Sequence, residues 1–342
     1  MSLGKKKILS QAAAADLTLY KTVLYSGNGG TKAVTGVGFK PDFVWIKSTN
    51  NTGRHLLTDV VRGTASQLFT NETLAAQNDL EFTSFDTDGF TLTFNSGSQN
   101  FNNSGTDYVA WCWKAGGTAI TGSGSNLTSI SRSTNTGVGG FSIVQYTSSG
   151  TSGATFAHGL GATPDIVLIK STSTASTNWI MSITNVVSNQ YLLVNDQGIG
   201  GTGGFAVDGT NVTLNNTLGD ANTSGRTYIA YCWASVTEFS KVGTFVGTGT
   251  TTGNIVTVGF EPAFLLVKST TLAGSNWILL DKARTPSNPM ENDLNPNLNN
   301  AQQGGTGSNF PQATTTSTTF QCNSTDGSIN RSGETYLYMV FK

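Results

Sequence analysis

The chain has 342 residues, which is long enough for two or three domains, and its formal net charge is −1. Only 11% of its residues are charged, and 10% are aromatic. The low charge argues against a nucleic-acid or acidic-membrane partner, and the aromatic content argues against a disordered chain. Three cysteines are too few for a disulfide scaffold, and no apolar run reaches the roughly 20 residues of a membrane span.

Residues 1–18 precede the first strand-like segment and differ from the rest of the chain. They combine three consecutive lysines, Lys5 to Lys7, with Ile8 and Leu9 and then small residues. We expect them to form a short N-terminal arm outside the first domain. The arm's basic and apolar residues suit contact with a negatively charged protein surface.

Two patterns recur three times in the same order. The first is Gly, two residues, Pro, one residue, four apolar residues and Lys-Ser-Thr, at residues 38–49, 161–172 and 259–270. The second is Asn-x-Ser-Gly-x-x-Tyr, at residues 102–108, 222–228 and 330–336. Repetition of both patterns at similar separation predicts three homologous modules in tandem.

Each module is expected to be a β-sandwich of jelly-roll type. Aromatic and β-branched residues predict strands at 107–113 and 227–233, and Gly- and Asn-rich segments interrupt the chain about every 8 to 12 residues. Asp88-Gly89 and Asp208-Gly209 predict hairpin turns, through the positive φ that Gly and Asp tolerate. The predicted fold is all-β: three tandem homologous β-sandwich domains preceded by the arm.

The domain boundaries follow from these patterns. They are 1–18 for the arm, 19–114 for module 1, 115–140 for the connection, 141–234 for module 2 and 239–342 for module 3. Ile120, Leu127 and Ile130 predict an edge strand within the connection. The short segment between modules 2 and 3 predicts two domains packed nearly rigidly against each other.

Lys47, Lys170 and Lys268 end the three Lys-Ser-Thr strands, and the motif imitates a phosphate-binding loop. Such a loop needs glycines before the lysine and a helix after it, and both are missing. We therefore expect core strands whose lysine lies where the strand reaches the surface. Residues 198–203 match Gly-x-Gly-x-x-Gly, the fingerprint of dinucleotide-binding sites. Because a predicted hairpin and not a helix follows, we interpret this as a chance match.

The cysteines and histidines give no catalytic or metal-binding pattern. Cys112 and Cys232 occupy a position where module 3 has Val340, which predicts an apolar interior site, and Cys322 is also expected to be a free buried thiol. His55 and His158 are not equivalent between modules. We expect no metal and no cofactor.

Acidic residues form two patterns that bear on catalysis and cation binding. Asp59 and Asp281 are each followed three residues later by an arginine, which predicts a structural ion pair. Asp86 and Asp88 resemble a fragment of a calcium loop but lack the further ligands, and cation binding there stays open. A polysaccharide-cleaving enzyme would need paired carboxylates in a cleft, so no enzyme is expected.

The segments GFKPDFVWIKS, SGTDYVAWCWKAG and AHGLGATPDIVLIKS resemble a tandem module of virion proteins from tailed bacteriophages, notably those of marine and cyanobacterial hosts. The similarity spans about residues 20–342 and is strongest in modules 1 and 2. Module 3 departs from it, with Ala263 in place of Asp and an insertion-like Pro- and Asn-rich loop at 285–311. The resemblance supplies no catalytic residue.

This resemblance implies a non-catalytic structural protein, exposed on the virion as a tail fibre, tail spike or capsid-decorating fibre and assembled in the host cytoplasm. The arm residues Lys5, Lys6, Lys7, Ile8 and Leu9 would then anchor the chain to other virion proteins. The loop residues Asn288, Asn292, Asn295 and Asn297 would contact a host glycan or protein. We expect a homo-oligomer. The alternative is an array of carbohydrate-binding β-sandwich modules, whose signature would be exposed Trp and Tyr side chains that stack on sugars.

Overall fold

The computed structural model describes residues 19–342 except 79, 97–99, 117–118, 135–139, 185–189, 216–217 and 306. Over these residues the fold is all-β, as predicted, with antiparallel sheets and one short helix, α1 (Gly327–Asn330). No helix within the described ranges has the length and apolar character needed to cross a membrane.

Module 1 consists of two sheets packed in a sandwich-like arrangement. The large sheet has the order β1-β9-β3-β4-β5-β6 and the small one β2-β8-β7. Their strands are β1 (Tyr20–Ser26), β2 (Thr31–Thr35), β3 (Phe43–Ser48), β4 (Leu56–Asp59), β5 (Gly63–Phe69), β6 (Gln77–Asn78), β7 (Phe82–Asp86), β8 (Gly89–Thr93) and β9 (Asp107–Trp113). Apolar residues from both sheets, such as Val44 of β3 and Phe90 of β8, share one core.

Module 2 has the same two-sheet plan, with additional strands from the connection. The large sheet has the order β10-β12-β13-β21-β15-β16-β17-β18 and the small one β11-β14-β20-β19. Their strands are β10 (Ile120–Thr121), β11 (Gly124–Ser125), β12 (Leu127–Thr134), β13 (Phe141–Ser148), β14 (Thr155–Ala157), β15 (Ile166–Ser171), β16 (Ile180–Ile183), β17 (Gln190–Leu193), β18 (Gly201–Thr202), β19 (Ala206–Val207), β20 (Asn211–Thr213) and β21 (Thr227–Trp233). Strand β12 of the connection lies beside β13.

Module 3 has fewer strands. Its large sheet has the order β22-β30-β24-β25, the small one β23-β29-β28, and β26 pairs with β27 alone. The strands are β22 (Ser240–Val246), β23 (Ile255–Thr257), β24 (Phe264–Ser269), β25 (Ile278–Asp281), β26 (Asn292–Asp293), β27 (Gln303–Gly304), β28 (Ala313–Thr315), β29 (Thr319–Cys322) and β30 (Thr335–Phe341).

Equivalent strands have the same neighbours and register in the three large sheets. In each sheet the Lys-Ser-Thr strand lies between the last strand of its module and the strand that follows it in sequence. The opposed residues are Phe43 and Trp113, Ile166 and Trp233, and Phe264 and Phe341. Equivalent positions of the modules can therefore be compared residue by residue.

The large sheets are buried on both faces. In β9, Val109, Trp111 and Trp113 point into a core shared by the modules, whereas Ala110 and Cys112 point into the module's own core. Successive side chains of a strand point to opposite faces, so both residue sets must be apolar. This explains the uninterrupted apolar runs that precede each Lys-Ser-Thr.

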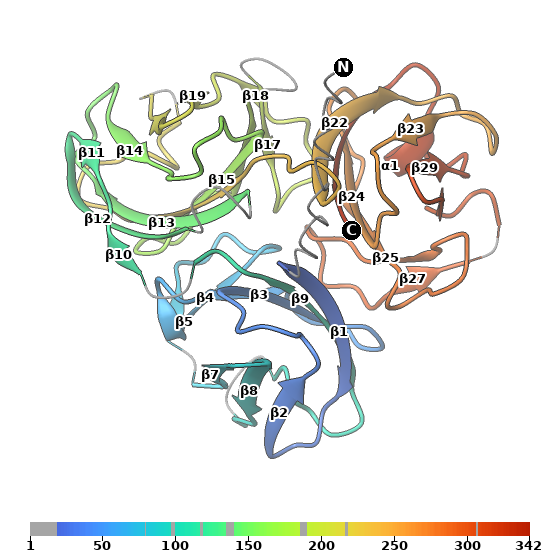
Figure 1. The fold of residues 1–342 in the computed structure, drawn as a ribbon, viewed down its shortest axis with the longest axis horizontal. Coiled ribbons are helices and arrows are strands. Elements are labelled where there is room, and N and C mark those ends of the chain that lie inside the picture. Colours follow the sequence, from blue (N-terminus) through green and yellow to red (C-terminus); the bar gives the residue numbers. More distant parts are fainter. Residues whose placement is uncertain are drawn as a thin grey trace, which may run out of the picture.

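The shared core lies where the three modules meet around a common centre (Figure 1). Tyr20 of module 1 stacks on Phe341 of module 3, with ring centroids 5.0 Å apart. Phe43 of module 1 contacts Tyr231 of module 2 at 4.7 Å. Module 1 also contacts module 3 through a buried hydrogen bond, in which Thr70 Oγ1 donates to the carbonyl of Pro296 at 2.7 Å, so the ring of modules is closed.

Both predicted hairpin turns are present, but the aspartates act through their side chains. Asp86 pairs with Gly89, whose φ is 148°, and the Asp88 carboxylate accepts the N–H groups of Gly36 and Gly38 at 3.1 and 2.5 Å. Asp208 Oδ1 accepts two main-chain N–H groups within its own turn. These hydrogen bonds fix the turns, and positive φ contributes only at Gly89 among the four residues predicted.

Candidate functional site

The lysines of the three Lys-Ser-Thr motifs are buried, and the expectation that they reach the surface is wrong. The exposed fraction of each of the three side chains is 0%. Lys170 Nζ donates to the carbonyl and hydroxyl of Thr177 at 2.9 and 2.6 Å, and to the carbonyl of Thr73 in module 1 at 3.2 Å. Lys268 repeats this arrangement with Ser275 and with the carbonyl of Gln197 in module 2.

The neighbouring module therefore covers the strand end that the sequence suggested would be solvated. Lys47 differs, because its three acceptors, the carbonyl and hydroxyl of Ser48 and the carbonyl of Asn51, belong to its own module. Burial lowers the pKa of each lysine to about 8. Three acceptors match the three N–H donors of an ammonium group, so each lysine has a structural role.

The residue before the next strand makes a second contact between modules. Trp179 Nε1 donates to the carbonyl of Phe69 in module 1 at 2.8 Å, and Trp277 Nε1 donates to the carbonyl of Leu193 in module 2 at 2.9 Å. His55 takes this place in module 1 and accepts a hydrogen bond from Trp45 Nε1 at 3.1 Å. Burial lowers the pKa of His55 well below its ordinary value, so the imidazole is neutral.

Two Asp–Arg ion pairs lie in the centre of the molecule, which confirms that they are structural. Asp59 binds Arg62, and Asp281 binds Arg284, each at 2.6 Å with both partners buried. Each aspartate also accepts a hydrogen bond from another module. Tyr231 Oη donates to Asp59 Oδ2 at 2.8 Å, and Trp111 Nε1 donates to Asp281 Oδ2 at 3.1 Å.

The third junction between modules is apolar at the equivalent positions. Module 2 has Ile183 where the other modules have the aspartate, and module 3 has Met339 where they have the tyrosine or tryptophan donor. Both side chains belong to the shared core. Acid and donor are thus replaced together, as expected where an unpaired buried carboxylate would be costly.

The three cysteines are free and buried, as predicted. Cys112 and Cys232 lie in the cores of their modules, at the position of Val340 in module 3. Burial raises the pKa of Cys232 to about 12, and burial also raises the pKa of the other two thiols. Such thiols are not nucleophiles at neutral pH.

His158 and the carboxylates of the Asp-Thr-Asp-Gly turn are engaged by the fold. The ring nitrogens of His158 lie 3.1 Å from the carbonyl of Asp208 and 3.2 Å from the N–H of Leu160. Asp86 accepts the hydroxyls of Ser84 and Thr91, both at 2.7 Å. Within the described ranges no group of three or more His, Cys, Asp or Glu side chains could hold a metal ion.

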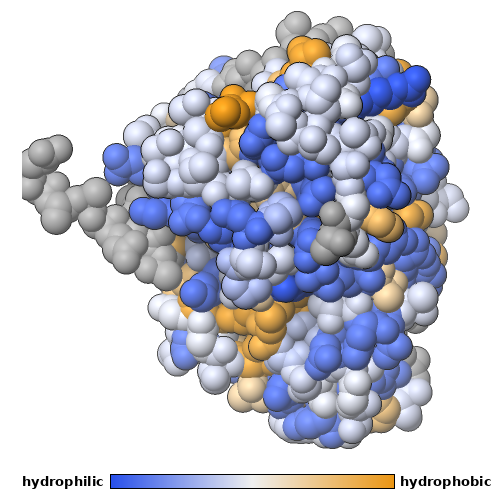
Figure 2. Space-filling view, turned by 90° about the vertical axis from the view of Figure 1, so that its right-hand side faces the viewer, coloured by the Kyte–Doolittle hydropathy of each residue, from blue (hydrophilic) through white to orange (hydrophobic). Residues whose placement is uncertain are grey.

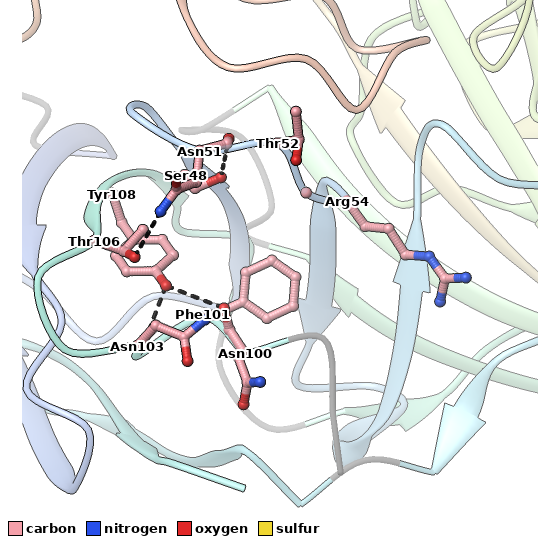
Figure 3. A pocket seen from close by; sticks show the side chains of 10 residues that line it. Ser48, Asn51, Thr52, Arg54, Asn100, Phe101, Asn103, Thr106 and Tyr108 are labelled. Carbon is pink, nitrogen blue, oxygen red and sulfur yellow. Dashed lines mark hydrogen bonds between the residues drawn. The ribbon is translucent and has the colours of Figure 1, made fainter. Parts of the chain in front are cut away.

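The recurring Asn-x-Ser-Gly-x-x-Tyr pattern forms a tyrosine-anchored corner. Tyr108 Oη accepts the N–H of Asn103 at 3.1 Å and donates to the carbonyl of Asn100 at 3.0 Å (Figure 3). Tyr228 and Tyr336 accept the equivalent N–H groups at 3.0 and 2.7 Å. The corner of module 1 borders a small polar cavity of about 40 Å³.

The residues predicted to contact a host are only partly exposed. Asn288 is exposed and Asn292 is half-buried, whereas the exposed fractions of Asn295 and Asn297 are 5% and 7%. Asn295 Nδ2 donates to the carbonyl of Trp277 at 2.9 Å, and Asn297 Oδ1 accepts the N–H of Trp277 at 3.1 Å. The expectation that Asn295 and Asn297 contact a host is therefore wrong, because their side-chain amides bond the main chain of Trp277 and are buried.

The predicted anchoring residues Lys5, Lys6, Lys7, Ile8 and Leu9 lie outside the described residues. On the face shown in Figure 2, hydrophilic and neutral residues predominate, and apolar residues gather in a hollow between its upper and lower parts. The large apolar side chains that are exposed are Leu24, Leu80, Ile120, Val246, Ile255 and Phe310.

Asp293 provides a test of how burial tunes a charged group. Its exposed fraction is 2%, and burial, partly offset by Arg284, raises the pKa of its carboxyl from 3.8 to about 6. The folded state then holds this proton more tightly than the unfolded state, so the associated stability is full below pH 3.8 and is lost as the pH rises through about 6. Asp293→Asn should raise the free energy of unfolding by about 1 to 3 kcal/mol at neutral pH and leave it unchanged at pH values below 4. Urea unfolding at both pH values measures this, and an equal effect at both would contradict the assignment.

Comparison with known proteins gives one family. Residues 17–342 match a family described as "Domain of unknown function (DUF7483)". No curated protein and no solved structure matches the chain.

Proposed function

We propose, from the premise that the chain belongs to this family, that it is a non-catalytic structural protein of a tailed-bacteriophage virion. It would be exposed on the particle as a tail fibre, tail spike or capsid-decorating fibre. We further propose that its fold consists of three tandem homologous β-sandwich domains of jelly-roll type, joined into one closed body. The sequence resemblance and the use of polar groups in the fold both support this proposal.

The observation that carries the proposal is the role of the buried ionisable groups. Lys170 and Lys268 fasten neighbouring modules through main-chain carbonyls. The ion pairs of Asp59 and Asp281 each accept a donor from another module. A chain that uses its buried charges to fasten modules together is suited to a mechanical role on a particle.

Open sheet edges suggest where partners bind. In module 2, strand β12 covers the edge of β13, but among the described strands none covers the equivalent edges of β1 and β22. Leu24 on β1 and Val246 on β22 are 51% and 56% exposed. Exposed apolar edges are ready sites for strand pairing, so we place contacts to other virion proteins or to further copies of the chain there. The arm at 1–18 would supply the anchor, and the exposed Asn288 would lie at the outward loop.

Immunogold labelling of purified particles tests this function. Antibodies raised against the folded chain should label particles of the bacteriophage whose genome encodes it, at one defined position on the particle. Recovery of the chain only in the particle-free fraction would overturn the virion role. A tagged copy that lacks residues 1–18 should enter particles less than the tagged full chain does. Equal incorporation would refute the anchoring arm and leave the virion role standing.

A further inference from the structure

Module 2 has a surface cavity of about 260 Å³. Tyr191, Leu193 and Leu218 give it apolar walls, and Asn178 and Asp220 give it polar groups. This volume lies just below the roughly 300 to 1,000 Å³ of drug-sized ligand sites, so the cavity suits a ligand smaller than a drug. Its lining thus combines apolar side chains with a few polar groups that can fix the orientation of a ligand.

At three positions in or beside this cavity, module 2 has smaller residues than module 1. In module 1 the place is filled by Phe69 and Phe101, whose rings stack with centroids 6.4 Å apart, and by Arg54, whose guanidinium lies 5.0 Å from the centre of the Phe69 ring. The equivalent residues of module 2 are Leu193, Ala221 and Asn178, as the strand registers and the Asn-x-Ser-Gly motif place them.

The polar groups of the cavity are held in fixed positions. Asp220 Oδ2 accepts the main-chain N–H and the side-chain amide of Asn178, at 3.1 and 3.0 Å. Asn195 Nδ2 donates to Asn178 Oδ1 at 3.0 Å, so the Asn178 amide is oriented from both sides. The Asp220 carboxylate is half-buried, and its second oxygen has lone pairs to offer a ligand. Preorganised groups of this kind bind a ligand without a further ordering cost.

The aromatic wall packs against the core of module 2. Tyr191 lies against Gly201 of β18, where a Cβ atom would come within 2.9 Å of the tyrosine hydroxyl oxygen. A side chain at this glycine would displace the ring. Tyr191 is half-buried, so part of its ring remains accessible beside the cavity.

We propose that this cavity binds one neutral pyranose unit of a glycan, a binding role that goes beyond the structural function. A pyranose has an apolar C–H face, which packs on an aromatic ring, and adjacent hydroxyls, which donate to a carboxylate. Tyr191 and Asp220 supply these two partners within one cavity. The negative charge of Asp220 disfavours acidic sugars, because a second carboxylate there would be repelled.

Saturation-transfer NMR on the intact chain tests the proposal. The probes are the methyl pyranosides of glucose, galactose and mannose, with N-acetylglucosamine as a fourth neutral sugar and glucuronic acid as the charged comparison, all at millimolar concentration. We expect signal from at least one neutral probe and none from glucuronic acid. Binding should weaken at least about tenfold in Tyr191→Ala and in Asp220→Asn, since each removes one of the two recognition elements.

Two further variants separate the cavity from general effects. Leu193→Phe installs the residue that fills this place in module 1 and should abolish binding while the fold is kept. Phe310→Ala removes an aromatic side chain that is 38% exposed and lies outside the cavity, and it should leave binding unchanged. Absence of binding by every neutral probe would overturn the proposal. Binding that survives both Tyr191→Ala and Leu193→Phe would overturn it equally.

Discussion

Replacement of Asp281 by alanine is expected to lower the free energy of unfolding by about 3 to 5 kcal/mol, the usual effect of removing one partner of a buried ion pair. The carboxylate bonds Arg284 at 2.6 Å, and the exposed fractions of the two side chains are 0% and 2%. Without it the guanidinium stays buried without its counter-charge. Trp111 Nε1 of module 1 also loses its acceptor, which it contacts at 3.1 Å. Urea unfolding followed by tryptophan fluorescence measures the loss.

Module 2 provides the matched control for this variant. Its sequence has Ile183 and Val186 at the positions of Asp281 and Arg284. The double variant Asp281→Ile with Arg284→Val copies this apolar pair and removes both charges together. It should therefore recover part of the lost stability, because an apolar pair often replaces a buried ion pair at little cost, whereas Trp111 Nε1 still lacks its acceptor. If the free energy of unfolding of Asp281→Ala lies within about 0.5 kcal/mol of the wild-type value, the ion pair does not stabilise the fold as expected.

Much of the fold was predictable because the same sequence patterns recur in two or three modules. A position that accepts Cys112, Cys232 and Val340 must be apolar interior, and the structure places all three in the cores of their modules. The Asp–Arg spacing likewise predicted ion pairs, since a residue pair repeated at one place in two modules serves the fold. Alternation along single strands carries this information, so no knowledge of long-range contacts was required.

The errors arise where a segment is covered by another segment that lies far from it in the sequence. The sequence around Lys170 predicts a strand that ends in a polar residue. It does not indicate that the carbonyl of Thr73 in module 1 accepts a hydrogen bond from this lysine. Asn295 and Asn297 lie in a Pro- and Asn-rich segment that looks like a solvated loop, but their amides pair with the main chain of Trp277. Contacts of this kind join segments that sequence patterns treat separately.

The cavity of module 2 was missed although the sequence contains a signal for it. When the modules are aligned on the Asn-x-Ser-Gly motif, Ala221 of module 2 occupies the position of Phe101 in module 1. The loss of a large side chain within an otherwise repeated core indicates a hollow or a compensating residue. Only the strand registers show that Leu193 replaces Phe69 at the same place, so that the hollow remains.

Replacement of Phe264 by alanine is expected to lower the free energy of unfolding by about 3 to 5 kcal/mol and to weaken modules 1 and 3 together. The ring is 1% exposed and packs on four aromatic rings at centroid distances of 5.6 to 6.3 Å, three of them in module 1. Its removal leaves a hole that the surrounding rings cannot fill without moving. Calorimetry measures the loss and compares the calorimetric with the van't Hoff enthalpy.

The shared core gives this experiment a second outcome. Chains with independent domains unfold in separate steps, whereas modules that bury one another's aromatic residues should unfold in a single transition. Hydrogen exchange in β3, β15 and β24 should therefore lose protection together in Phe264→Ala. Phe310→Ala, which removes an exposed ring of module 3, should change stability by no more than about 0.5 kcal/mol. Loss of protection confined to β24 would contradict a common core, because β3 of module 1 would then keep its protection although the shared core has lost the Phe264 ring.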